Sequence, residues 1–338
     1  CLLRADRRCS RLAQPRCREV IKVKLTTSFP SWPLLRQTPG WSGEWGNCKF
    51  YVDDDSIDQC DYWVVYDGLT KKQTATCPQG NLLFVASEPP EIKKYQPGFL
   101  AQFSKVISSD RSIRHPSLCL AQQSLPWMIG VSQSPSGPKC VMDYDGFAKS
   151  APPIKTKLLS VVITKKRTTA GHRARLDFVE KLVDRYGAEI DVFGRGFQEV
   201  EDKWDAIAPY KYHLVLENSC RNDYFTEKLA DAFLGLAYPL YWGCPNLADY
   251  FPEKSFSPIQ LDDPDGVKAV VDAATYEASL EALEMSKRLV LAKYNLFAVL
   301  SSFIQDQMGG RPKALSRVTL RPEADLSYLG RALRKLRP

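Results

Sequence analysis

The second half of the chain alternates short apolar segments with amphipathic ones, and this alternation constrains the fold more than any other feature. The pattern predicts four strands, at Lys157–Thr164, Glu189–Phe193, Tyr210–Leu216 and Tyr238–Trp242. Between the first two, Ala174–Tyr186 has apolar residues at helical spacing, and a further helix is predicted from about Glu227. Strands that alternate with helices of this length are typical of a parallel, doubly wound sheet.

The first half of the chain has the rhythm of short strands and loops. Strands are predicted at Cys60–Tyr66, Asn81–Ser87 and Phe103–Ser108. Pro, Gly and Ser cluster at both ends of residues 131–157, which indicates the approach to a domain boundary. A chain of 338 residues is long enough for two sizeable cores. We therefore expect one domain over residues 25–150 and a second over residues 155–305.

The positive charge of the chain is concentrated at its two ends. Residues 1–24 and residues 311–338 carry +6 each, and because the whole chain carries +7, the body between them carries −5. We expect a flexible basic head over 1–24 and a basic C-terminal tail over 311–338. A negative body disfavours a nucleic-acid binder, so no nucleic-acid partner is predicted. The basic ends remain compatible with contact to an acidic membrane surface.

No apolar run approaches the ~18 residues that a membrane helix needs. The chain begins at Cys1 in place of Met, as a fragment or a processed form would, and the loss of an anchor upstream is compatible with that start. The ten cysteines include no CxxC pair, and with only three histidines a zinc site is not expected. Five cysteines between residues 48 and 140 fit either disulfides in an oxidising compartment or reduced buried thiols.

The residues with the clearest chemical meaning lie between Tyr210 and Gly243. A predicted strand ends in Glu217, Asn218 and Ser219, and ligands bind at this edge of open α/β sheets. Thr226 is the predicted N-cap of the next helix, whose first turn contains Glu227 and Lys228. A lysine in a first turn opposes the helix dipole. That local cost is understandable if the lysine faces an anion such as a diphosphate.

This segment resembles the signature of the family-ten α-1,3-fucosyltransferases, which follows a YKF…ENS…DYxTEK…PVxxG pattern. The matching positions are Tyr210, Lys211, Glu217, Asn218, Ser219, Asp223, Tyr224, Thr226, Glu227, Lys228, Pro239 and Gly243. Two positions depart from it: Tyr212 stands where Phe is usual, and Phe225 where Val is common. The resemblance implies an α/β fold of the GT-B type, two Rossmann-like domains facing a cleft. It also implies an inverting transfer of L-fucose from GDP-β-L-fucose to a hydroxyl of a glycan acceptor.

The resemblance assigns the donor-binding residues to the second domain. Lys228 would pair with the diphosphate, Glu227 would accept hydrogen bonds from the ribose hydroxyls, and Tyr224 and Asn218 would line the nucleotide-sugar pocket. Arg175 keeps the family's spacing to Phe178 and is assigned to the diphosphate, which suits its planar fork. Its rival is Arg173.

The catalytic base is assigned to the first domain. Glu88 directly follows an apolar strand and precedes Pro89 and Pro90, and this segment resembles the family's ESP motif. A positioned carboxylate would remove the acceptor proton as the hydroxyl attacks the anomeric carbon. Glu91 is the alternative base. Without the resemblance, Glu88 would be interpreted as an ordinary loop acid.

Several other residues invite a functional interpretation, and for each the structural interpretation is preferred. His213 is expected to be a core histidine, and Trp41, Trp45 and Trp127 are expected in the core. The run Asp53 to Asp55 is expected to be a polar turn, and the family architecture does not depend on a DxD metal site. No essential metal or cofactor is therefore predicted besides the donor substrate.

Two other functions stay open beside the fucosyltransferase interpretation. One is the same scaffold with a different nucleotide-activated sugar, and the other is a catalytically silent carbohydrate-binding relative. Family habit would place a eukaryotic member on the lumenal side of the Golgi membrane and a bacterial one in the cytoplasm. The acceptor glycan is not specified by the residues discussed above.

Overall fold

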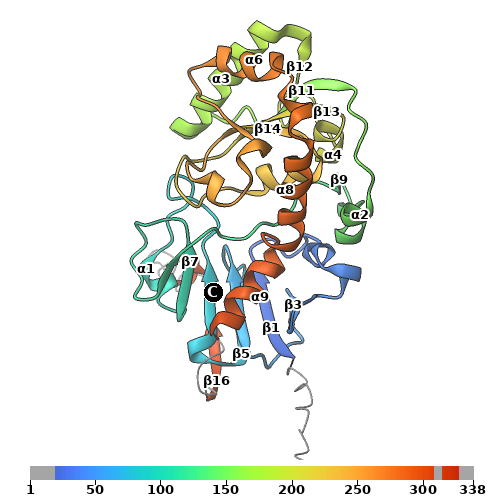
Figure 1. Cartoon of the computed structure of the whole chain (residues 1–338). Helices are drawn as coiled ribbons and strands as arrows, with labels where there is room; N and C mark the ends of the chain where they lie inside the picture. Colours follow the sequence, from blue (N-terminus) through green and yellow to red (C-terminus); the bar gives the residue numbers. More distant parts are fainter. Residues whose placement is uncertain (1–19, 308–313, 327–338) are drawn as a thin grey trace, which may run out of the picture.

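The computed structural model describes residues 20–307 and 314–326, and it consists of two α/β domains stacked end to end (Figure 1). Each domain is built on its own sheet, of seven strands in the N-terminal domain and five in the C-terminal domain. The two domains face one another across a cavity that residues of both line. This arrangement confirms the predicted fold class.

The N-terminal sheet has the strand order β2-β3-β1-β4-β6-β7-β8 and is parallel except for the short edge strand β2. Its strands are β2 (Glu44–Trp45), β3 (Cys48–Val52), β1 (Ile21–Thr27), β4 (Tyr62–Tyr66), β6 (Leu82–Val85), β7 (Lys105–Ser108) and β8 (Leu118–Leu120). The predicted strands at 60–66, 81–87 and 103–108 correspond to β4, β6 and β7. All five residues of β4 and all four of β6 are buried, as expected for parallel strands covered on both faces.

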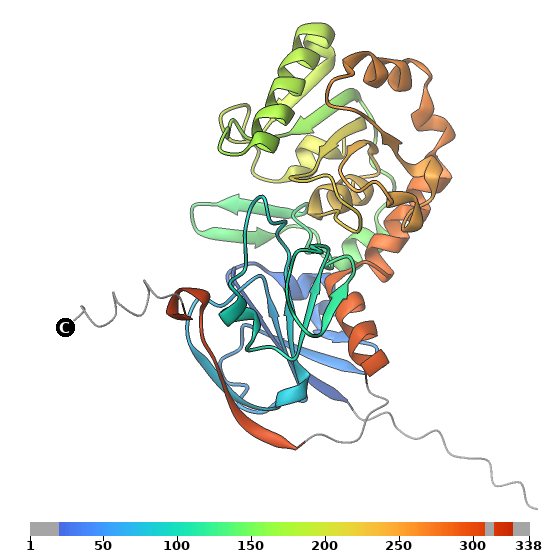
Figure 2. The ribbon, with the colours of Figure 1, turned by 90° about the vertical axis from the view of Figure 1, so that its left-hand side faces the viewer.

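Different elements cover the two faces of this sheet. Helix α9 (Leu296–Gln307) returns from the C-terminal domain and packs Phe297, Leu300 and Ile304 on one face. Helix α1 (Pro97–Leu100), the antiparallel pair β5 (Gln73–Pro78) and β16 (Leu315–Leu320), and helix α10 (Glu323–Leu326) lie on the other side. Figure 2 shows β16 running beside β5 at the lower edge of the molecule.

The C-terminal sheet is fully parallel, with the order β12-β11-β13-β14-β15. Its strands are β12 (Ile190–Phe193), β11 (Lys157–Val162), β13 (Tyr210–Leu216), β14 (Tyr238–Trp242) and β15 (Ser257–Pro258). Its helices are α3 (Ala170–Tyr186), α4 (Lys203–Ile207), α5 (Glu227–Leu234), α6 (Pro264–Asp272), α7 (Thr275–Ala278) and α8 (Leu280–Ala292). The predicted alternation of strand and helix is confirmed.

The expected domain boundaries differ from the structure at both ends of the C-terminal domain. Leu125, Trp127, Ile129 and Phe147 belong to the C-terminal core, although residues 25–150 were expected to form the first domain. The hairpin β9 (Val131–Ser134) and β10 (Gly137–Cys140) and helix α2 (Tyr144–Lys149) follow this segment. At the other end α9 leaves the second domain before residue 305. The chain therefore crosses between the domains twice, and apolar anchors on each crossing decide which core it joins.

The two basic ends are also more structured than their charge suggested. Strand β1 begins at Ile21, inside the range 1–24 that was expected to be a flexible head. Strand β16 lies inside the expected tail 311–338, where Val318 and Leu320 are buried and alternate with more exposed residues. This alternation is the period of a strand with one buried face. Residues 1–19, 308–313 and 327–338 lie outside the described part of the chain.

Candidate active site between the two domains

The C-terminal part of the site forms where β13 ends and α5 begins. Thr226 is the N-cap of α5, as predicted, and its Oγ1 accepts a hydrogen bond from the Lys228 backbone N–H at 3.4 Å. The same Thr226 donates its N–H and its hydroxyl to the two carboxylate oxygens of Glu217, at 2.8 and 2.7 Å. Glu217 is 0% exposed. The end of β13 and the start of α5 are thereby joined through the buried carboxylate of Glu217, the first residue after β13.

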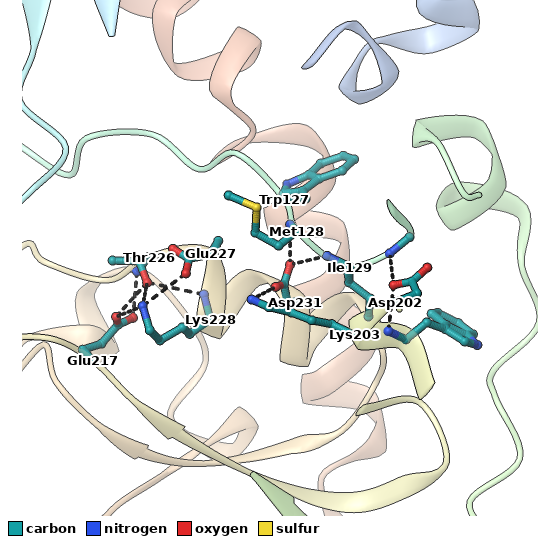
Figure 3. Close-up of polar contacts among 12 residues, drawn as sticks. Trp127, Met128, Ile129, Asp202, Lys203, Glu217, Thr226, Glu227, Lys228 and Asp231 are labelled. Carbon is teal, nitrogen blue, oxygen red and sulfur yellow. Dashed lines mark hydrogen bonds and ion pairs between the residues drawn. The ribbon is translucent and has the colours of Figure 1, made fainter. Parts of the chain in front are cut away.

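Lys228 completes this cluster of charges (Figure 3). Its Nζ lies 3.1 Å from Glu227 Oε1 and 3.7 Å from Glu217 Oε2. Burial by itself lowers the pKa of the Lys228 ammonium, but the Glu227 and Glu217 carboxylates outweigh it and raise that pKa. Burial by itself raises the pKa of Glu227, but Lys228 and then Lys203 lower it to about 2. Glu227 and Lys228 are therefore both ionised at neutral pH, beside the N-terminus of α5.

Arg175 reaches the same place from α3. It is 6% exposed, and its side chain donates from Nε to Gly171 O at 3.2 Å and from NH1 to Leu216 O at 3.0 Å. Within residues 20–307 and 314–326, no carboxylate oxygen lies within 4.0 Å of its nitrogens. Burial lowers the pKa of Arg175, and Glu217 offsets this only in part. A buried guanidinium without an ion-pair partner is ready to receive an anion.

A cavity of about 260 Å³ opens over these residues within the C-terminal domain. Arg175, Asn218, Glu227 and Lys228 line it together with His172 from the first turn of α3. Tyr224 does not line this cavity. A concave site with a few convergent charged groups at the carboxyl edge of a parallel sheet is the usual geometry of a nucleotide pocket.

A second cavity, of about 240 Å³, lies between the domains. Glu88 and Asp67 line it from the N-terminal domain, and Tyr224 lines it from the C-terminal domain. Asn218, Glu227 and Lys228 line both cavities. The structure thus brings Glu88 to the same space as the predicted donor-binding residues, although more than a hundred positions separate them in the sequence.

The environment of Glu88 is typical of a group that exchanges a proton. Burial raises the pKa of its carboxyl group, and the negative charges of Asp67 and Glu227 raise it further. Lys228 and Lys93 oppose this effect. A carboxylate with a raised pKa in a cleft is a stronger base than an exposed one.

The rival residues lie in other surroundings. Glu91 lies outside the lining of the cavity between the domains and pairs with Arg221 of the C-terminal domain, with Oε1 and NH2 2.5 Å apart. Arg173 is exposed and donates to Arg167 O at 3.0 Å. The geometry therefore favours Glu88 and Arg175 over their rivals, while the roles of both remain predictions.

The structural interpretations of the other side chains have mixed outcomes. His213 is buried and bonds Ser160 Oγ through Nδ1 at 2.8 Å, so the prediction of a core histidine is confirmed. Trp127 is fully buried, but Trp41 is 41% exposed and donates to Asp143, so its placement in the core was wrong. Trp45 is half-buried at the edge strand β2.

The expected polar turn after β3 is present. Asp53 accepts the Thr27 N–H at 2.8 Å and the Thr27 hydroxyl at 2.7 Å. Asp54 accepts the N–H and the hydroxyl of Ser56. These carboxylates are thus engaged in closing the loop after β3.

The site contains three more charged residues that the sequence analysis did not single out: Asp231, Lys203 and Asp67. Asp231, on α5, accepts the backbone N–H groups of Met128 and Ile129 at 2.9 and 3.0 Å and pairs with Lys203 Nζ at 2.9 Å (Figure 3). Asp67 follows β4 directly. A polar residue at the end of a predicted strand was the available signal for Asp67, whereas Asp231 looked like an ordinary polar position on an amphipathic helix.

Among the described residues, no group of three or more His, Cys, Asp or Glu side chains is placed to hold a metal ion. None of the helices in that same part of the chain is long and apolar enough to span a bilayer. The seven cysteines that the structure describes are unpaired thiols, four of them buried.

Comparison with known proteins identifies the second domain. Residues 152–280 match the family model "Glycosyltransferase family 10 (fucosyltransferase) C-term". An alpha-(1,3)-fucosyltransferase of Helicobacter pylori is 40% identical over 57 residues, which are 17% of this chain and 12% of that protein. The 4-galactosyl-N-acetylglucosaminide 3-alpha-L-fucosyltransferase 9 of Mus musculus is 31% identical over 148 residues, 42% of this chain and 38% of that protein. These matches therefore span less than half of either relative.

A solved structure of an alpha1,3-fucosyltransferase with GDP-fucose is 17% identical in sequence to this chain, with a TM-score of 0.43. The structural alignment covers 82% of this chain and 84% of the fucosyltransferase chain. The family match covers β11 to α7 and ends at the first residue of α8, so it includes Arg175, Asn218, Tyr224, Glu227 and Lys228. Residues 152–280 of this chain therefore match the C-terminal domain of glycosyltransferase family 10, the fucosyltransferase family.

Proposed function

We propose that this protein is an inverting glycosyltransferase that moves L-fucose from GDP-β-L-fucose to a hydroxyl of a glycan acceptor, as an α-1,3-fucosyltransferase does. One observation carries the proposal: Glu88 of one domain lines the same cavity as Glu227 and Lys228 of the other. An enzyme that joins two substrates needs its base and its donor-binding groups at one place. The match of residues 152–280 to a fucosyltransferase family model supports fucose as the transferred sugar.

The donor side is built to hold a nucleoside diphosphate. Arg175 and Lys228 place two positive charges beside the N-terminus of α5, where the positive end of the helix dipole also favours an anion. Glu227 is held ionised and suits the paired hydroxyls of a ribose. As the bond between the sugar and the diphosphate breaks, negative charge grows on the leaving group, and these two cations stabilise it.

The acceptor side needs a group that removes one proton. In the proposed step, the acceptor hydroxyl oxygen forms a bond to the anomeric carbon from the face opposite to the diphosphate. Its proton passes to the Glu88 carboxylate, and the bonding electron pair of the broken C–O bond leaves with GDP. The raised pKa of Glu88, caused by burial and by neighbouring carboxylates, supports this role.

Two other functions remain as alternatives to be excluded by experiment. A different nucleotide-activated sugar would use the same cations, because they recognise the diphosphate rather than the base. A silent carbohydrate-binding relative would have no need for a half-buried Glu88 beside the donor groups. The name of the mouse relative gives a 4-galactosyl-N-acetylglucosaminide as its acceptor, and this disaccharide is the first acceptor to test here.

A thermal-unfolding panel with GDP, UDP, CMP and a short oligonucleotide tests the proposal. We expect GDP to stabilise the protein most, by about 2.7 kcal/mol at a concentration of ~100 times its dissociation constant. Equal stabilisation by all three nucleotides would refute the guanine assignment, and stabilisation by the oligonucleotide alone would refute the enzyme class. Turnover of GDP-fucose with the disaccharide then separates an enzyme from a silent relative.

A further inference from the structure

Asp67 lies beside Glu88 in an unusual backbone conformation. It directly follows β4 and has a φ of 63°, in the left-handed region that non-glycine residues rarely adopt. Its carboxylate accepts the Ser28 hydroxyl at 2.9 Å, the Tyr95 hydroxyl at 2.7 Å and the Lys93 ammonium at 3.3 Å. A backbone conformation of this kind costs about 1–3 kcal/mol and persists where the surroundings impose it, often at functional sites.

Tyr95 connects Asp67 to Glu88. A tyrosine hydroxyl has one proton, and here that proton is donated to Asp67 Oδ1. The hydroxyl oxygen of Tyr95 in turn accepts the backbone N–H of Glu88, at 3.3 Å. Burial raises the pKa of Tyr95, and the Asp67 charge raises it further, so the hydroxyl stays protonated. The direction of both hydrogen bonds is therefore fixed.

We propose that Asp67 and Tyr95 form a positioning pair for Glu88: Tyr95 holds its backbone at the cavity, and Asp67 acts on its carboxylate with a fixed negative charge. This inference rests on the proposed function, because it takes Glu88 as the base. Neither residue is assigned to touch the substrates. Their effect on the reaction passes through Glu88.

The charges that act on Glu88 come from both domains. Asp67 and Glu227 are negative, and Lys228 and Lys93 are positive. The Lys93 ammonium is bound to Asp67 itself, through its carbonyl oxygen at 2.6 Å and its carboxylate. Three tyrosines, Tyr66, Tyr95 and Tyr224, complete the titratable groups nearby, and the pKa of each is raised by burial.

A purely structural role for the pair is the competing explanation, since the Tyr95 ring packs against Phe84 with ring centroids 5.1 Å apart. Two variants remove the polar functions and keep the packing. Tyr95→Phe removes only the hydroxyl. Asp67→Asn removes the charge, and asparagine tolerates the left-handed backbone.

The chain offers a matched control for each variant. Tyr238→Phe removes a buried hydroxyl that bonds Ser257 at 2.9 Å, outside both cavities of the site. Asp53→Asn alters another aspartate that follows a parallel strand, β3, with a φ of 48° and a carboxylate bound to Thr27. Each control changes a comparable hydrogen-bonded group at a residue that has no link to Glu88.

The readouts are kcat, KM for GDP-fucose and the pH profile of kcat/KM, all on the full chain. Turnover needs ionised Glu88, so activity rises with pH through the Glu88 pKa. Loss of the Asp67 charge lowers that pKa, so Asp67→Asn should move the acid limb of the profile to lower pH. Tyr95→Phe should leave the limb in place and reduce kcat by about 10²-fold, the cost of a misplaced catalytic group, with KM for the donor unchanged.

Two results would overturn the inference. One is an acid limb in Asp67→Asn at the wild-type position, and the other is a kcat in Tyr95→Phe equal to that of Tyr238→Phe. Glu88→Gln in the same panel tests the proposed function separately, because full activity in that variant refutes the base itself. If Asp67→Asn fails to respond to GDP in thermal unfolding, Asp67→Gly removes the charge with a residue that suits the backbone.

Discussion

Asp231 and Lys203 form an ion pair of 2.9 Å in the C-terminal domain, and this pair also holds the chain that connects the two domains. The second oxygen of Asp231 accepts the backbone N–H groups of Met128 and Ile129, which lie where the chain enters the C-terminal domain. Asp231 stands one helical turn after Glu227 on α5 (Figure 3). The helix that carries Glu227 and Lys228 therefore also anchors the segment that connects the two domains.

The first prediction concerns the stability of this anchor. Asp231→Ala leaves the Lys203 charge, the buried N–H group of Ile129 and the partly buried one of Met128 without this partner, and we expect it to cost about 3–5 kcal/mol. Asp231→Asn keeps an acceptor for the N–H groups and should cost less. Denaturant unfolding measures both, with the exposed Asp205→Ala as control. A cost for Asp231→Ala no larger than that of Asp205→Ala would show that the connection is held by other contacts.

The second prediction concerns Arg175, whose charge is buried without an ion-pair partner. Arg175→Met loses two hydrogen bonds to backbone carbonyls, worth about 0.5–1.5 kcal/mol each, but relieves the burial of a charge. We expect little change in unfolding without ligand and loss of most of the stabilisation by GDP. Arg173→Met, on the exposed side of the same helix, should keep the GDP response. The opposite pattern would assign the diphosphate to Arg173.

The third prediction follows from His213. Burial lowers its pKa to about 3, and the positive charges of Lys203 and Lys155 contribute. An unfolded histidine has a pKa of about 6.5, so the unfolded chain binds the proton first as pH falls. The free energy of unfolding should therefore fall below pH 6.5, by up to about 1.4 kcal/mol per pH unit from this group.

His213→Gln tests this assignment, because glutamine can still bond Ser160 but does not titrate. Its free energy of unfolding should depend less on pH than that of the wild type between pH 6.5 and 4.5. His115→Gln, in the other domain, controls for the loss of an imidazole. Equal pH dependence in His213→Gln and the wild type would mean that other groups cause the acid sensitivity.

The sequence predicted the C-terminal domain more fully than the N-terminal one, for physical reasons. Strand β13, the N-cap Thr226 and helix α5 are adjacent in sequence, so local patterns specify them. Glu88 could be located only through a short resemblance, because its neighbour Asp67 comes from a separate loop, the one that follows β4. Contacts between distant segments leave no local pattern.

The errors in domain boundaries have a related cause. Strand β16 has the alternation of a half-buried strand, but its arginine and its basic surroundings suggested a solvated tail. Helix α9 was assigned to the domain that precedes it in sequence, although its apolar residues pack on the other core. The composition of β16 and α9 does not indicate which core they join, because that depends on the distant residues against which they pack.

The fourth prediction concerns metal. Lys228 and Arg175 line one cavity and are proposed to neutralise the leaving diphosphate, so activity should persist in EDTA, with some reduction at most. Turnover of GDP-fucose with and without EDTA measures this directly. Complete loss of turnover that manganese restores would show that the leaving group is neutralised by a metal.

The last prediction concerns Glu88, because it separates an enzyme from a sugar-binding relative. Glu88→Gln keeps the size of the side chain but cannot take a proton at neutral pH. Turnover should fall by roughly 10²–10⁴-fold, the usual contribution of a positioned general base. In the proposed site the donor is held by Arg175, Glu227 and Lys228 of the other domain, so the affinity for GDP-fucose should barely change. Loss of turnover with unchanged donor binding indicates an interaction made only in the transition state.

Glu91→Gln is the internal control for this experiment. Glu91 pairs with Arg221 at 2.5 Å and is about half exposed, so its loss removes an ion pair between the domains and no base. A pair of this exposure is worth about 0.2–1 kcal/mol, and turnover should stay near that of the wild type. If Glu91→Gln loses turnover and Glu88→Gln retains it, the base is Glu91. If neither variant loses turnover, the acceptor proton passes to a group other than these two carboxylates.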